Sequence, residues 1–127
     1  KGFLTEILKE FKQNDIRTSV FLDPKLKQVE GAKVIGADRI ELYTEAYALQ
    51  YSLGNKDSIT PYSESAELAM QLDLGLNAGH DLSLDNIKFF KQNVTGLLEV
   101  SIGHALISES LYFGIDNVIN MYLNKLK

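Results

Sequence analysis

The sequence has 127 residues, with no cysteine, no tryptophan and only two histidines. Without cysteine the chain can form no disulfide, hold no metal through thiolates and use no cysteine nucleophile. With two histidines as the remaining strong ligands, we expect no metal site, and we predict no cofactor. No apolar run approaches the roughly 20 residues of a membrane span and no signal peptide opens the chain, so we expect a cytoplasmic protein with no membrane partner.

Positive charge is also scarce. Lys and Arg number 13 against 17 Asp and Glu, so the net charge is −4. Such a chain has no basic patch for nucleic acid or an anionic membrane, and we predict neither as a partner. Apolar residues make up 45% and charged residues 24%, as in ordinary globular proteins. A chain of this length forms one domain at most, and we assign residues 1–127 to a single domain.

Segments typical of strands and helices alternate along the chain. Runs rich in β-branched, aromatic and other apolar residues begin near positions 17, 39, 74 and 97 and predict strands. Helices are predicted over residues 3–14, 24–35, 60–72, 84–92 and 105–113, and again from 115. This order predicts an α/β fold with a parallel sheet. The polar segment 45–60 is long for a connection, and we expect a functional loop there.

Three helix starts carry capping signals. Asp23 precedes Pro24, Thr60 precedes Pro61, and Ser83 precedes the helix predicted from residue 84. Asp, Thr and Ser side chains accept hydrogen bonds from the first free amides of a helix, and proline fits its first position. We therefore expect these three side chains to be helix caps.

The predicted strands alternate between apolar positions and polar or small ones. The apolar set is Val20, Leu22, Ile40, Leu42, Leu76, Ala78, Leu98, Val100 and Ile102. A sheet between two helical layers would be apolar at nearly every position, as in doubly wound domains. One apolar face and one polar face instead favour a barrel, in which the polar face lines a lumen. We predict four βα units of a (β/α)8 TIM barrel.

Both histidines follow a glycine at the end of a predicted strand. They stand in the segments Asn77-Ala-Gly-His80 and Ser101-Ile-Gly-His104. Ligands of parallel α/β folds bind at that edge, and histidine titrates near neutral pH, so His80 is a candidate acid–base group. The alternative is that both are strand-end residues bonded to the backbone. The short helix after Gly103 and His104 could also present amides to a phosphate, or be a plain strand-to-helix turn.

Glu41 lies inside a predicted strand between Ile40 and Leu42. A buried carboxylate is costly unless it is paired or protonated, and a tuned site residue would explain it. The alternatives are a carboxylate paired with a neighbouring lumen residue, or one that faces water on an edge strand. Glu99 shows the same pattern, but its neighbours indicate no chemistry.

Several of these segments together resemble the pyridoxine 5′-phosphate synthase family of vitamin B6 biosynthesis. They are Leu76-Asn-Ala-Gly-His80, Ser101-Ile-Gly-His-Ala105, Val20-Phe-Leu-Asp23, Gly36-Ala37, Ile40-Glu-Leu-Tyr-Thr44 and Tyr47-Ala48. The resemblance covers essentially the whole chain. It implies a TIM barrel of which this chain supplies strands five to eight. It also implies a transferase that condenses 3-amino-2-oxopropyl phosphate with 1-deoxy-D-xylulose 5-phosphate into pyridoxine 5′-phosphate, phosphate and water.

The resemblance also implies roles for individual residues. His80 matches the proton-donating histidine, and Glu41 matches a glutamate that stabilises a transition state. Asp81 falls where the family usually has a glycine in contact with the aminoketone phosphate. Gly103 and His104 match the residues that bind the phosphate of the same substrate. Segment 45–60 would lie over the mouth of the site.

The sequence departs from the family at three positions and in length. Asp81 and Glu45 stand where many members have glycine, and Tyr43 where many have histidine. The first four βα units, with two further catalytic groups, are absent. We therefore expect the carboxyl-terminal half of a longer polypeptide that is inactive alone, needs its amino-terminal half and forms a homo-oligomer, by resemblance an octamer. The alternatives are another phosphosugar-binding β/α barrel, or a non-catalytic half-barrel that requires its complement.

Overall fold

The computed structural model describes residues 2–127 and contains a four-stranded parallel sheet. Its strands are β1 (Ser19–Leu22), β2 (Arg39–Tyr43), β3 (Gly75–Gly79) and β4 (Leu97–Ser101), and they pair in that order. All three pairings are parallel. The predicted α/β class and parallel sheet are therefore confirmed.

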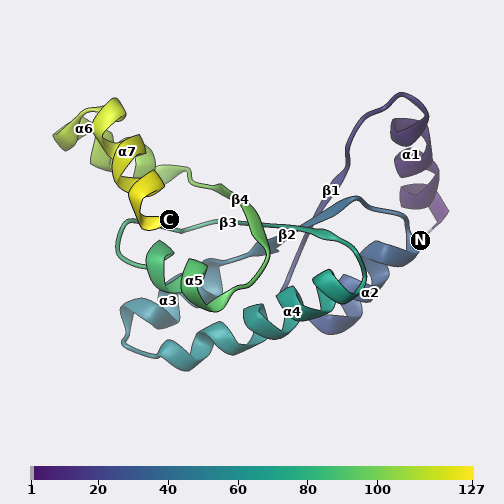
Figure 1. Cartoon of the computed structure of the whole chain (residues 1–127), viewed down its shortest axis with the longest axis horizontal. Helices are drawn as coiled ribbons and strands as arrows, with labels where there is room; N and C mark the ends of the chain where they lie inside the picture. The colour runs from purple at the N-terminus through teal and green to yellow at the C-terminus, as the bar shows by residue number, and fades with distance from the viewer. Residues whose placement is uncertain (1) are drawn as a thin grey trace.

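Helices precede, separate and follow the strands. They are α1 (Gly2–Gln13), α2 (Leu26–Val34), α3 (Glu45–Ser52), the 3₁₀ helix η1 (Lys56–Ile59), α4 (Thr60–Gln71), α5 (Ile87–Asn93), α6 (His104–Phe113) and α7 (Ile115–Lys125). Figure 1 shows α2, α3, α4 and α5 on one side of the strands, with α1 at one end of the molecule and the α6–α7 pair at the other. The helical layer thus covers one face of the sheet.

The core lies between that layer and the covered face of the sheet. Ile40 and Leu42 of β2 and Ala78 of β3 are fully buried there, together with Val29 of α2 and Phe90 of α5. The opposite face stays open, and Phe21 of β1 is 55% exposed on it. One covered and one open face are consistent with part of a TIM barrel.

Segment 45–60 is not a loop, contrary to the prediction. It forms α3 and η1, and Tyr47 of α3 is fully buried. The ring of Tyr47 packs edge-on to Phe90 at 5.0 Å, and its hydroxyl donates to the Asn86 carbonyl at 2.7 Å. The segment looks polar because tyrosines supply much of its buried surface, and tyrosine satisfies its hydroxyl by hydrogen bonding.

Asp23 is not a helix cap. Helix α2 begins at Leu26, and Lys25 is its N-cap residue. The Asp23 carboxylate instead accepts a hydrogen bond from Lys25 Nζ at 2.8 Å, which lowers the pKa of Asp23. Its backbone amide donates to the side chain of Gln28 at 2.9 Å.

The other two predicted caps also differ from the structure. Asn86 is the N-cap residue of α5, and Ser83 lies in the turn before it, where its amide donates to Asn86 Oδ1 at 2.9 Å. Thr60 is already the first helical residue of α4, without a side-chain capping bond. Pro61 does occupy the first turn, where a missing amide costs nothing.

Leu98 breaks the predicted alternation. Leu97 pairs with Leu76, but Asn77 pairs with Glu99, so β4 carries one extra residue at this point. Leu98 is that residue and is 59% exposed, not on the covered face. Beyond it the alternation resumes, and Glu99 and Ser101 lie on the open face beside Asn77 and Gly79.

Candidate functional site

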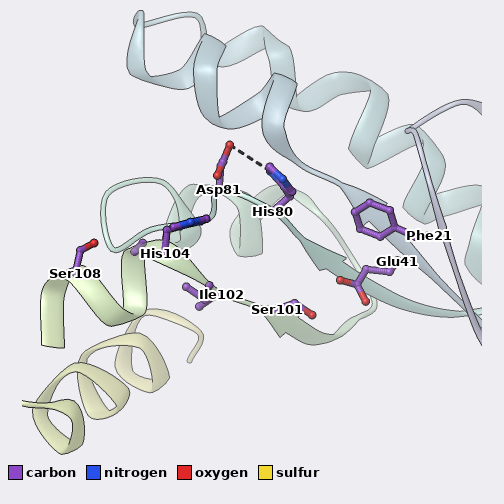
Figure 2. Close-up of a pocket in the computed structure, with 10 residues that line it drawn as sticks. Phe21, Glu41, His80, Asp81, Ser101, Ile102, His104 and Ser108 are labelled. Atoms are coloured by element: carbon purple, nitrogen blue, oxygen red, sulfur yellow. Dashed lines mark ion pairs between the residues drawn. The ribbon is translucent and has the colours of Figure 1, made fainter.

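A pocket of about 680 Å³ opens at the carboxyl ends of the strands. It is lined by Phe21, Glu41, His80, Asp81, Ser101, Ile102, Gly103, His104, Ala105 and Ser108. Figure 2 shows these residues arriving from β1, β2, the segment after β3, and the β4–α6 junction. All five residues singled out in the sequence are therefore brought together in one pocket. The roles assigned to them remain predictions.

The turn that carries His80 has an unusual backbone. His80 and Asp81 follow the last residue of β3 with φ angles of +88° and +58°. Positive φ is uncommon for residues with a side chain and costs on the order of 1–3 kcal/mol each. Two such residues in succession need support from the surrounding structure.

Thr44, at the end of β2, supplies much of that support. It is fully buried, and its amide donates to the Gly79 carbonyl at 2.9 Å. Its hydroxyl lies within hydrogen-bonding distance of two carbonyls, that of Gly79 at 2.8 Å and that of His80. On the far side of the turn, Asn86 Nδ2 donates to the Asp81 carbonyl at 3.1 Å. The backbone of the turn is thus held on both sides.

Two buried tyrosines hold these supports in turn. The Tyr62 hydroxyl donates to the Tyr43 carbonyl at 2.9 Å, which fixes the end of β2. The Tyr47 hydroxyl donates to the carbonyl of Asn86 at 2.7 Å. Burial raises the pKa of both tyrosines, so both stay neutral donors at physiological pH.

The imidazole of His80 has a neighbour on each of two sides. Its Nδ1 lies 3.2 Å from Asp81 Oδ2, a contact drawn as the dashed line in Figure 2. The ring of Tyr43 meets it edge-on, with centroids 4.6 Å apart. The Tyr43 hydroxyl donates to Glu45, and this bond raises the pKa of Tyr43 to about 12. Tyr43, Glu45 and Asp81, the three positions at which the sequence is expected to depart from the family pattern, therefore form one cluster around His80.

Glu41 reaches the pocket because β3 ends in a glycine. A Cβ atom at Gly79 would lie 2.5 Å from Glu41 Oε1 and 2.8 Å from Ser101 Cβ, closer than real contacts allow. The carboxylate of Glu41 therefore occupies space that any other residue at position 79 would take. Within residues 2–127 this carboxylate forms no hydrogen bond or ion pair, so the predicted alternative of a paired lumen glutamate is wrong for the described chain.

Gly103 and His104 open helix α6 at the edge of the pocket. Gly103 is the N-cap residue, and its carbonyl accepts from the Ile107 amide at 3.3 Å. A Cβ atom at Gly103 would meet nothing within 4 Å, so packing within the chain does not require glycine here. The first amides of a helix and its dipole favour an anion, and α6 has no acidic residue in its first turn.

Positive charge lies at the opposite end of the open face. Arg39 Nη1 is 2.8 Å from Glu99 Oε1, Arg17 is 3.4 Å from the same oxygen, and Asn77 bridges the pair. Partial desolvation would raise the pKa of Glu99, but the two arginine charges outweigh it and hold the pKa below its usual value of 4.5. Glu99 is thus a paired structural carboxylate, whereas no Lys or Arg is among the residues that line the pocket.

Comparison with known proteins decides the family. The whole chain, residues 1–127, matches the family described as Pyridoxal phosphate biosynthesis protein PdxJ. The chain belongs to the PdxJ family. A pyridoxine 5′-phosphate synthase of Flavobacterium johnsoniae is 70% identical over 125 residues, which are 98% of this chain and 53% of that protein. One from Christiangramia forsetii is 56% identical over 127 residues, which are 100% of this chain and 54% of its own length.

The chain spans about half the length of the PdxJ relatives it matches. The predicted family resemblance is confirmed, and the relatives are named pyridoxine 5′-phosphate synthases. Within residues 2–127, no three His, Cys, Asp or Glu residues gather to hold a metal ion. In the same range, every helix is too short or too polar to cross a membrane.

Sequence reasoning missed the buried residues of this PdxJ family member that hydrogen-bond the backbone of the turn carrying His80. Thr44 and Asn86 were not singled out, and Tyr47 was placed in a loop. A weak signal was available for Thr44, since it is the last residue of the predicted strand that contains Glu41. Its partners, however, are carbonyls 35 and 36 residues away, and no local sequence pattern predicts these hydrogen bonds.

Proposed function

We propose that this chain forms part of a pyridoxine 5′-phosphate synthase. In this proposal the complete enzyme condenses 3-amino-2-oxopropyl phosphate with 1-deoxy-D-xylulose 5-phosphate, and releases pyridoxine 5′-phosphate, phosphate and water. The observation that carries the proposal is the convergence of Glu41, His80, Asp81, Gly103 and His104 on one pocket at the carboxyl edge of the sheet. The names of the relatives support it.

Each group has a chemical role in the proposal. His80, on its supported turn, donates a proton to a leaving oxygen during dehydration, as a general acid. Glu41, a carboxylate without a partner in the described chain, stabilises positive charge that develops on the substrate in the transition state. The amides of Gly103 and His104 bind the phosphate of the aminoketone substrate.

The pocket as described is only part of the proposed site. Both substrates carry phosphate groups, but the lining residues include Glu41 and Asp81 and no Lys or Arg. In the proposal, positive charge for the phosphates comes from the remainder of the barrel. In the proposal, four further βα units pair with the edge strands β1 and β4, close a TIM barrel and supply these groups, and the chain alone is inactive.

A homo-oligomer is part of the proposal as well. Helix α6 exposes Leu111 and Tyr112 by more than four-fifths of their surface, and α7 exposes Ile119 and Leu123. Apolar surface of this extent fits burial against other chains or the rest of the barrel. Sedimentation of the full-length protein measures the assembly, and a monomer would contradict it.

The proposed function is tested by measuring product formation from the two phosphorylated substrates. The full-length polypeptide should release pyridoxine 5′-phosphate and inorganic phosphate in equal amounts. The 127-residue chain should release neither, and adding the separately produced amino-terminal half should restore activity. A full-length protein that turns over other sugar phosphates but not this pair would contradict the synthase assignment. Full turnover by the 127-residue chain alone would contradict the requirement for a second half.

A further inference from the structure

We propose that Asp81 is a positioning residue for His80. Its carboxylate accepts a hydrogen bond from Nδ1 of the imidazole, and this leaves Nε2 as the nitrogen that exchanges a proton with substrate. The inference rests on the proposed function, in which His80 is the general acid. It concerns a carboxylate at a position where the resemblance implies a glycine in contact with substrate.

The geometry of the pair indicates which imidazole nitrogen faces the carboxylate. Asp81 Oδ2 lies 3.2 Å from His80 Nδ1, and Figure 2 shows the carboxylate turned towards the imidazole. An ionised carboxylate can only accept hydrogen bonds, so in the proposed arrangement Nδ1 carries the hydrogen. In the neutral imidazole Nε2 is then the acceptor, and in the charged one it is the acidic donor. Either way, the proton that changes is on Nε2.

An exposed ion pair would ordinarily hold a side chain only weakly, and both partners here are 47% exposed. The fixed backbone of the turn makes this contact less costly in conformational entropy than an ordinary exposed ion pair. His80 and Asp81 are adjacent and share the left-handed turn, whose carbonyls are bound by Thr44 and Asn86. The carboxylate and the imidazole therefore start from fixed Cα positions, and little conformational freedom is lost when they meet.

The other flank of the imidazole is also fixed. The Tyr43 ring meets it edge-on at 4.6 Å and packs edge-on against Phe21 at 5.3 Å. The Tyr43 hydroxyl is held by Glu45 and does not compete for the imidazole nitrogens. With Tyr43 against one side and Asp81 at Nδ1, the imidazole has one orientation that satisfies both contacts.

A different reading of Asp81 makes a different prediction. If its carboxylate faced the substrate phosphate, the two negative charges would repel, and removing the carboxylate would tighten substrate binding. If Asp81 positions His80, removing it disturbs proton transfer and leaves substrate binding largely unchanged. The split between kcat and KM therefore separates the two readings.

The experiment compares Asp81→Asn and Asp81→Gly in the full-length protein. Asparagine and glycine both tolerate positive φ, so neither adds strain to the turn. Asparagine keeps the shape and an acceptor oxygen but loses the charge, whereas glycine loses both. The ¹⁵N chemical shifts of the His80 ring, assigned by their loss in His80→Asn, report which nitrogen carries the hydrogen, and steady-state kinetics give kcat and KM.

We expect the fraction of His80 with hydrogen on Nδ1 to fall from wild type to Asp81→Asn and further in Asp81→Gly. In the glycine variant we expect kcat to fall about 10-fold to 100-fold, by analogy with the loss when the hydrogen-bond partner of a metal-binding histidine is removed, with KM within about twofold of wild type. An unchanged tautomer, or an unchanged kcat with a lower KM, would overturn the proposal. The tautomer measurement needs no substrate, so it still tests Asp81 if the wild-type protein shows no synthase activity and the proposed function fails.

Discussion

Glu41 and Glu99 lie in the same cross-strand row of the sheet, both in register with Asn77, yet their carboxylates extend towards opposite ends of the strands. Glu99 pairs with Arg39 and Arg17 towards the amino ends. Glu41 lies over Gly79 towards the carboxyl ends, without a partner in the described chain. One row thus contributes a paired structural carboxylate and a free one at the pocket.

The pairing of Glu99 predicts a pH-dependent contribution to stability. Its pKa is lowered in the folded chain, so Glu99 stabilises the fold above its unfolded pKa, and this contribution is lost as pH falls through the lowered value. Glu99→Gln should therefore reduce the free energy of unfolding at pH 7 more than at pH 3, as measured by urea denaturation of the full-length protein. Glu67→Gln, at an exposed position of α4, is the control. An equal loss from Glu99→Gln at both pH values would contradict the prediction.

Gly79 is predicted to be required for the placement of Glu41. In Gly79→Ala the new methyl would collide with Glu41 Oε1 and Ser101 Cβ, so the free energy of unfolding should fall by about 1–3 kcal/mol. Turnover of the full-length enzyme should fall as well, because the carboxylate is displaced. A double-mutant cycle with Glu41→Ala checks the cause. If the two changes were additive, displacement of Glu41 would not explain the loss.

His80→Asn is predicted to remove turnover without unfolding the protein. Loss of a general acid typically costs about 10²–10⁴-fold in rate. Asparagine tolerates the positive φ at this position, and the imidazole is half-exposed, so the unfolding free energy should change little. His104→Asn is the matched comparison and should raise KM for the aminoketone phosphate more than it lowers kcat. Wild-type turnover in His80→Asn would remove His80 from the mechanism.

Thr44 is predicted to support the site through its hydroxyl. Thr44→Val keeps the shape but leaves the carbonyls of Gly79 and His80 without that donor, so the free energy of unfolding should fall by about 1–3 kcal/mol. Turnover should fall too, because the turn that carries His80 loses a support. Thr44→Ser keeps the hydroxyl and should retain most of the turnover. Equal activity of the valine and serine variants would contradict this role.

The sheet and the convergence of the site could be predicted because both follow from local patterns. Alternation at Ile40, Glu41 and Leu42 indicates a strand with one covered face, and repeated strand–helix units dictate parallel pairing. Once the strands are parallel, a glycine–histidine pair at the end of each of two strands must meet at one edge. Position in the chain therefore sufficed to bring His80 and His104 to the same pocket.

The remainder depends on contacts between distant parts of the chain. Helix α3 was missed because its buried face consists largely of Tyr47, whose hydroxyl is satisfied by a residue 39 positions away. The caps were misplaced by one to three residues. At α5, for example, the N-cap residue is Asn86, and its side chain binds the Ser83 amide and the Asp81 carbonyl instead of capping the helix. The pairing of Asp81 with His80 depends on backbone angles that composition does not reveal.

The extra residue in β4 has a consequence for how the chain tolerates changes in length. With Leu98 present, two residues of β4 oppose Leu76, and Glu99 then falls beside Asn77. Deleting Leu98 would let Leu97 and Glu99 follow one another in regular register, with Glu99 and Ser101 still on the open face. Deleting Leu97 would give the same polypeptide, because the two leucines are adjacent, whereas deleting Glu99, Val100 or Ser101 would place different side chains beside β3. Loss of one of the two leucines is therefore a single-residue deletion within a strand that conserves the pairing of Asn77 with Glu99 and of Gly79 with Ser101.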